Sequence, residues 1–156
     1  EIADGDWSSD VCSSDLRFFG DILPAEVEGI SERVRAYPER LSAVATAWRA
    51  LGAFPSERRP QVLWLGLADP QEALVRLASE VTRDLEETGF GRPDKPFRAH
   101  VTLGRVRRGA RVQMPGSDDL TIPQAPFSIS AIALIRSRLT PRGPVYTPIE
   151  TAHLQE

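Results

Sequence analysis

The sequence predicts an α+β domain, because helical and alternating apolar patterns follow one another along the chain and turn residues separate several of the strands. Its 156 residues fit one domain or one compact pair of lobes, and 41% hydrophobic residues supply a core. A single cysteine, Cys12, excludes an internal disulfide and a cysteine zinc cluster. No apolar run approaches the roughly 18 residues of a membrane span.

Residues 1–16 differ from the rest of the chain. They hold five acidic residues and no basic one, and they include the stretch GDWSSDVCSSDL, which resembles a translation of sequencing-adapter DNA. We therefore interpret residues 1–16 as a non-native or disordered N-terminal segment and residues 17–156 as the domain. The net charge of −3 becomes +2 for residues 17–156, with 19 basic and 17 acidic residues, so charge does not exclude a nucleic-acid partner.

The first predicted elements are a short strand, a helix and a second strand. Leu16–Gly20 is predicted to be the end of a strand that meets a turn glycine. Residues 24–36 form a predicted helix, with a proline in its first turn, apolar residues at helical spacing and another proline beyond its end. The segment Leu41–Leu51 fits either a helix or a strand. Gly52–Pro60 is expected to be a loop, and Val62–Leu67 a buried strand.

The clearest helix is predicted for residues 69–89. Asp69 is placed to cap it, Pro70 suits the first position, and Glu72 stands three residues after the cap, where it would complete a capping box. Gly89 is expected to end it. The apolar stripe of this helix comprises Leu74, Leu77, Ala78, Val81 and Leu85.

The C-terminal part of the chain is predicted to consist of strands. Phe97–Val106 shows the alternation of a strand, and residues 107–124 form a polar loop. Phe127–Ile135 is predicted to be a strand that becomes buried on both faces toward its end. A turn at 141–144 then leads into a return strand, Val145–Ile149.

The Phe97–Val106 strand carries a set of side chains suited to phosphate chemistry. Because residues two apart share a face, Arg98, His100 and Thr102 project together, with Gly104 on their face and Arg105 on the opposite one. Imidazole moves protons near neutral pH, and hydroxyl and guanidinium groups donate hydrogen bonds to phosphate oxygens. His-x-Thr alone also fits a half-buried structural histidine. The basic run from Arg105 onward fits either a solvated loop or phosphate contact with a nucleic acid.

Four separated segments resemble the 2H phosphoesterase superfamily. Phe97–Leu103 resembles its second His-x-Thr-Leu motif, and Leu16–Gly20 looks like the tail of its first. Segments 51–65 and 136–148 resemble the bacterial and archaeal RNA 2′,3′-cyclic phosphodiesterases of this superfamily, once called 2′-5′ RNA ligases. The resemblance runs in the family's order from Leu16 to the C-terminus.

This resemblance implies a two-lobed fold in which antiparallel sheets line a central groove and helices lie outside, here without the first strand and helix. It implies that a 2′,3′-cyclic phosphate is opened to a 2′-phosphomonoester without metal or cofactor. His100 would accept the proton from water and Thr102 would hold phosphate oxygens. Arg98 and Arg17 are predicted to bind the substrate, an RNA with a 2′,3′-cyclic phosphate end or a cyclic nucleotide. We expect a cytoplasmic monomer with no membrane partner, in which His100 and Thr102 line the groove. The missing first strand and helix should leave an exposed sheet edge or a hole in the N-terminal lobe.

The first His-x-Thr pair of the superfamily is absent from this sequence. Alignment on Leu16 places its histidine at Ser13 and its threonine at Asp15. Serine is no acid near neutral pH and an ionised aspartate repels phosphate, so we expect the activity of this chain to be impaired. Three alternatives remain: a phosphodiesterase for small cyclic nucleotides, a 2′-5′ RNA ligase of the same fold, or a catalytically dead nucleotide-binding module.

Overall fold

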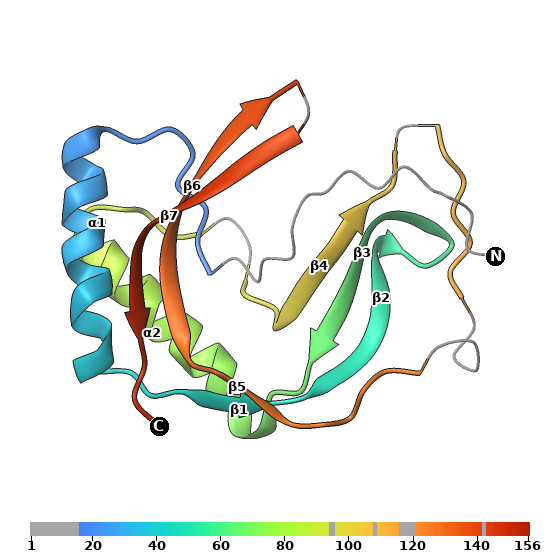
Figure 1. The fold of residues 1–156 in the computed structure, drawn as a ribbon, viewed down its shortest axis with the longest axis horizontal. Coiled ribbons are helices and arrows are strands. Elements are labelled where there is room, and N and C mark those ends of the chain that lie inside the picture. The colour runs from blue at the N-terminus through green and yellow to red at the C-terminus, as the bar shows by residue number, and fades with distance from the viewer. Residues whose placement is uncertain (1–15, 94–95, 108, 116–120, 142) are drawn as a thin grey trace.

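The computed structural model describes residues 16–93, 96–107, 109–115, 121–141 and 143–156. It confirms the α+β class: two helices lie on one side of the molecule, and a curved antiparallel sheet of three strands lies on the other (Figure 1). The helices are α1 (Pro24–Ala36) and α2 (Ala73–Glu87). The strands, in sheet order, are β2 (Trp48–Ser56), β3 (Arg59–Leu67) and β4 (His100–Arg105).

Two smaller antiparallel pairs complete the described strands. β1 (Val44–Thr46) pairs with β5 (Phe127–Ile129), and β6 (Ala131–Thr140) pairs with β7 (Gly143–His153). Short 3₁₀ turns, η1 (Tyr37–Glu39) and η2 (Pro70–Glu72), follow α1 and precede α2. Of the N-terminal segment 1–16, residues 1–15 lie outside the described residues, so its interpretation as non-native or disordered stays a prediction.

The hydrophobic core lies between the two helices and the strands that cross them. All five residues of the predicted α2 stripe are buried, as are Ile30 and Val34 of α1. Ile132 and Leu134 of β6 and Leu67 of β3 pack into the same cluster. Full burial of one such side chain contributes about 1.5–3 kcal/mol relative to leaving it exposed. Neither of the two described helices is long and apolar enough to cross a membrane.

The start of α2 differs from the predicted capping box. Asp69 does cap the helix, because its carboxylate accepts hydrogen bonds from the backbone N–H groups of Leu74 (2.7 Å) and Val75 (3.1 Å). Glu72, however, is no capping-box partner, since it has a φ of 56° and stands immediately before the first helical residue. The intervening 3₁₀ turn moves the helix start, so Asp69 reaches donors five and six residues later.

Two predictions about the N-terminal half are wrong. Leu16–Gly20 forms no strand, because a strand needs a hydrogen-bonded neighbour and no ladder among the described residues includes it. Gly52–Pro60 is a β-hairpin between β2 and β3 rather than a loop. Its prolines, Pro55 and Pro60, face each other beside the turn, at the end of the sheet, where a missing N–H is tolerated.

The predicted strand at 127–135 is also corrected. It is divided at Ser130, because β5 pairs with β1 whereas β6 pairs with β7. β6 is buried on one face only: Ile132 and Leu134 are buried, while Ile135 is 49% exposed.

The outer part of the β6–β7 hairpin projects from the molecule (Figure 1). It exposes several large apolar side chains: Ile135, Leu139, Val145, Tyr146 and Ile149. Within the described residues this hairpin pairs with no third strand. An exposed sheet edge or a hole left by a missing first strand and helix stays a prediction.

Asp84 is a buried charge that the helical pattern does not reveal. It lies on α2 with 2% exposure, and its Oδ1 accepts hydrogen bonds from Arg33 (3.0 Å) and Arg40 (2.7 Å). The Tyr37 hydroxyl donates to its Oδ2 at 3.3 Å. Burial opposes ionisation, but the hydrogen bond from Arg40 and the charges of both arginines outweigh it, so the pKa of Asp84 is lowered. Burial also raises the pKa of Tyr37, and the nearby carboxylate adds to this. The cluster ties α2 to α1 and η1.

Candidate active site

The pairing of β3 with β4 places His100 and Thr102 on one face of the three-stranded sheet. His100 is in register with Gly66, and Thr102 with Trp64. Both side chains are half-buried, so His100 does not lie in a closed apolar core, which would have excluded a catalytic role. The residue between them points the other way, and this residue, Val101, packs against the hydrophobic core. The predicted juxtaposition of imidazole and hydroxyl is therefore present.

A backbone hydrogen bond defines the protonation pattern of the His100 ring. Its Nδ1 lies 2.7 Å from the carbonyl oxygen of Arg98. A carbonyl only accepts hydrogen bonds, so Nδ1 is the protonated nitrogen. In the neutral ring the lone pair is then on Nε2, which leaves this atom able to accept a proton.

A β-bulge in β4 changes which residues accompany His100. Leu63 pairs with Gly104 while Trp64 pairs with Thr102, so Leu103 is an extra residue in β4. Beyond the bulge the faces exchange, and Arg105 pairs with Val62. Val62 lies two residues before Trp64 and shares its face.

The prediction that Gly104 shares the His100 face and Arg105 the opposite one is therefore wrong. Arg105 stands on the face of His100 and Thr102, while Gly104 is buried on the other. The alternating pattern alone gave no sign of the extra residue. The extra residue is Leu103, whose side chain is 43% exposed.

Two aromatic rings flank His100 on the same face. The centroid of the Phe54 ring lies 5.6 Å from that of His100 with the planes at 86°, and the Trp64 ring lies at 6.1 Å and 73°. The two aromatic rings contact each other at 5.4 Å. Sequence reasoning missed both, because Trp64 reads as part of a buried apolar run and Phe54 as part of a loop.

The two predicted substrate-binding arginines have different surroundings. Arg98 directly precedes β4, its side chain is exposed, and its carbonyl oxygen holds His100. The guanidinium of Arg17 donates a hydrogen bond to the carbonyl of Gly91, in the loop after α2, while its Nε is buried without a hydrogen-bond partner among the described residues. Arg98 thus contacts the site through its backbone carbonyl, which accepts the hydrogen bond from His100. A contact of either side chain with substrate stays a prediction.

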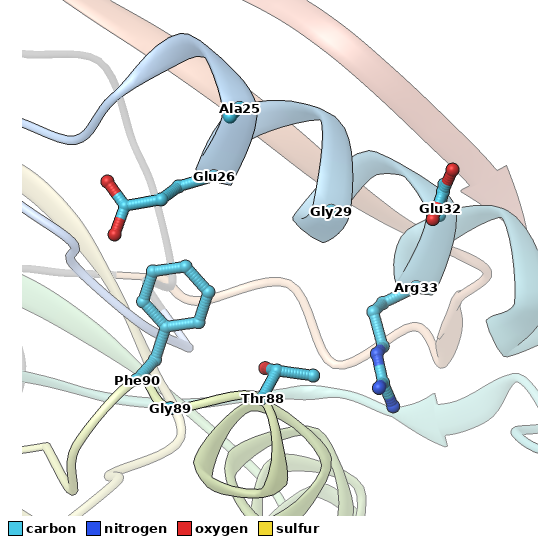
Figure 2. A pocket seen from close by; sticks show the side chains of 8 residues that line it. All are labelled: Ala25, Glu26, Gly29, Glu32, Arg33, Thr88, Gly89 and Phe90. Atoms are coloured by element: carbon cyan, nitrogen blue, oxygen red, sulfur yellow. The ribbon is translucent and has the colours of Figure 1, made fainter.

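A cavity of about 410 Å³ lies elsewhere, between α1 and the end of α2 (Figure 2). Its charged lining residues, Glu26, Glu32 and Arg33, come from α1, and the side chains of Glu26 and Arg33 extend toward Phe90 and Thr88, which follow α2. Its lining includes neither His100 nor Thr102, so it is separate from the candidate site. A groove at His100 stays a prediction.

Comparison with known families places the chain. The family model described as the 2′-5′ RNA ligase superfamily matches residues 17–141, which include the whole His100 site. The chain belongs to the 2′-5′ RNA ligase superfamily. Within this superfamily it is similar to a protein named RNA 2′,3′-cyclic phosphodiesterase from Aquifex aeolicus, with 31% identity over 89% of this chain and 76% of the relative. A protein of the same name from Archaeoglobus fulgidus is 36% identical over 84% of this chain and 73% of the relative.

Solved structures of other proteins have the same fold. A crystal structure of a Thermus thermophilus protein superposes with a TM-score of 0.74 at 28% identity, covering 90% of this chain and 76% of that one. Escherichia coli LigT complexed with 3′-AMP gives a TM-score of 0.72 at 21% identity, covering 97% and 82%. The latter similarity shows the fold alone. Together they confirm the 2H phosphoesterase fold that the sequence predicts.

Proposed function

We propose that this chain is an RNA 2′,3′-cyclic phosphodiesterase, which opens a terminal 2′,3′-cyclic phosphate to a 2′-phosphomonoester. The observation that carries the proposal is that His100 and Thr102 lie on the same face of the sheet. Nδ1 of His100 is hydrogen-bonded to the Arg98 carbonyl, which leaves the lone pair on Nε2. The names of the curated relatives support the same reaction.

The proposed reaction needs one base at the attacking water and donors at the phosphate. The water oxygen forms a bond to phosphorus while the bond from phosphorus to O3′ breaks, and the water proton passes to Nε2 of His100. The Thr102 hydroxyl donates to a phosphate oxygen as negative charge develops, and the Arg105 guanidinium faces the same side of the sheet. The departing O3′ takes up a proton and becomes the 3′-hydroxyl.

The turnover of this chain is limited by the lack of a positioned donor for the proton that the departing O3′ takes up. The superfamily's first-motif histidine would supply it, but this sequence has Ser13 at that position and Asp15 in place of the threonine. Both residues lie outside the described part of the structure. With solvent as the remaining proton source, we propose turnover that is lower by about 10²–10⁴ than with a positioned acid.

The test is hydrolysis of an oligoribonucleotide with a 2′,3′-cyclic phosphate end, with the product identified as the 2′-phosphomonoester. His100→Ala is expected to abolish the residual turnover. The control is His153→Ala, since His153 is exposed at the end of β7, on another sheet. Equal rates for the two variants and the parent chain would refute the proposal.

The same assay separates the alternatives. Faster turnover of cyclic mononucleotides than of RNA ends would assign the site to small cyclic nucleotides, and joining of RNA ends would assign it to ligation. Binding of a nucleoside 2′-phosphate, with no turnover by the parent chain or any variant, would indicate a catalytically dead nucleotide-binding module. Because RNA ends are an intracellular substrate, we propose a cytoplasmic enzyme, and we propose a monomer, which light scattering of the purified chain tests.

A further inference from the structure

Three rings on one sheet face form a compact group around His100. The ring planes of Phe54 and Trp64 are tilted by 31° to each other, and both rings stand edge-on to the imidazole, at 86° and 73°. The two larger rings therefore form a wall along one side of the imidazole. Edge-on arrangements with ring centroids about 4.5–7 Å apart are favourable for aromatic pairs and contribute about 0.5–1.5 kcal/mol beyond the buried area.

Two glycines make room for the indole of this wall. Gly52 is the cross-strand partner of Trp64, and a Cβ added there would lie 2.2 Å from Cζ2 of the indole. Gly66, the partner of His100, lies on its other side, where an added Cβ would be 3.3 Å from Cζ3. The indole thus lies down against the backbone of the sheet, and side chains at these two positions would displace it.

Hydrogen bonding does not explain why the indole lies there. Its Nε1–H is buried and has no hydrogen-bond partner among the described residues, which opposes this placement. The aromatic contacts that the placement provides are those with Phe54 and with the imidazole of His100.

The His100 ring is then restrained at two points. The Arg98 carbonyl accepts a hydrogen bond from Nδ1 and so determines the tautomer, and the rings of Phe54 and Trp64 lie edge-on beside the imidazole. Without the wall, the ring could rotate about its side-chain bonds and lose the short bond to the carbonyl.

We propose that Trp64, supported by Phe54, is a positioning residue that holds the imidazole of His100 in the orientation for proton transfer at Nε2. This proposal rests on the proposed function, because it assigns a purpose to the orientation of a catalytic base. Since Trp64 acts through His100, its loss should lower kcat and leave KM within about twofold. A misplacement of the base by about 1 Å costs on the order of 10² in rate.

The experiment compares Trp64→Leu, which keeps apolar bulk but loses the ring, with Trp64→Phe, which keeps a ring. Gly52→Val is a second route to the same effect, because it displaces the indole and leaves both Trp64 and His100 in the sequence. The matched control is Trp48→Leu, since Trp48 packs on Phe127 at 4.7 Å, on the core side of the sheet. Circular dichroism confirms the fold of each variant.

Two readouts are taken: kcat and KM on the cyclic-phosphate oligoribonucleotide, and the ring ¹⁵N shifts of His100 in long-range ¹H–¹⁵N spectra at about pH 8.5. We expect Trp64→Leu and Gly52→Val to lower kcat by about 10–10² and to shift the two ring nitrogens toward a mixture of tautomers. Trp64→Phe should recover most of both, and Trp48→Leu should change neither.

Unchanged kcat and unchanged nitrogen shifts in a folded Trp64→Leu variant would overturn the proposal. A raised KM with unchanged kcat would also overturn it, because it would show that Trp64 contacts substrate instead. The nitrogen shifts need no turnover. If His100→Ala is as active as the parent chain, the proposed function fails. If the nitrogen shifts of His100 do not change in Trp64→Leu, the positioning role of Trp64 fails, and the two failures are therefore distinguishable.

Discussion

Replacement of Asp84 by asparagine tests how the helical layer is held together. Asp84→Asn keeps the shape of the side chain and an oxygen for Tyr37, but it removes the charge that Arg33 and Arg40 face at 3.0 and 2.7 Å. Removing one partner of a fully buried ion pair costs about 3–5 kcal/mol. The arginine side chains are 37% and 47% exposed, so water recovers part of that loss, and we expect destabilisation by about 2–3 kcal/mol.

The stability difference between the parent chain and Asp84→Asn should depend on pH in a known direction. The pKa of Asp84 is lower in the folded chain than the roughly 3.9 of an unfolded aspartate, so its ionisation stabilises the fold above about pH 4. That stabilisation is lost as the pH falls through the folded-state pKa. Urea unfolding of the parent and Asp84→Asn chains should therefore differ most at neutral pH and converge in acid.

The control for this experiment is Glu28→Gln, which breaks an exposed pair with Arg35 and should leave the urea midpoint unchanged. A difference under about 0.5 kcal/mol at neutral pH for Asp84→Asn would refute the assigned role of the cluster. A difference that persisted unchanged into acid would refute its electrostatic origin.

Two further predictions concern the start of α2 and the first motif. Asp69→Ala should destabilise the fold by about 1–2 kcal/mol in urea unfolding, because two backbone N–H groups lose their acceptor; Asp69→Asn should recover most of this, and equal losses for both would contradict a capping role. The double substitution S13H/D15T should raise turnover of the cyclic-phosphate end by about 10²–10⁴, because it restores a proton donor for O3′; S13A/D15T is its control, and equal rates for the two would contradict the assigned deficit.

The helices could be predicted from the sequence because local signals agree there. The stripe from Leu74 to Leu85 is buried as predicted, since one face of an amphipathic helix must pack on the core. The shared face of His100 and Thr102 could also be predicted from the sequence, because residues two apart in a strand project from the same face.

What the sequence did not reveal depends on pairing between distant segments. The β2–β3 hairpin forms across two prolines, whose local preference favours a loop, because the cross-strand partners of Gly52 to Phe54 outweigh it. The division of 127–135 at Ser130 is likewise decided by which neighbours the two halves meet. The burial of Asp84 depends on arginines that lie 44 and 51 residues away.

The extra residue at Leu103 exchanges the two faces of β4 for every residue that follows it in the strand. A regular strand offers every second residue to a ligand, which fixes the next functional position after Thr102 at residue 104. Because of this extra residue, a cation stands on the His100 face five residues after the histidine, in the spacing His-x-Thr-x-x-Arg, and the buried Gly104 lies on the opposite face. A deletion of one residue here would exchange the inner and outer sides of everything that follows in the strand, so the spacing itself, rather than the identity of Leu103, is what the site requires.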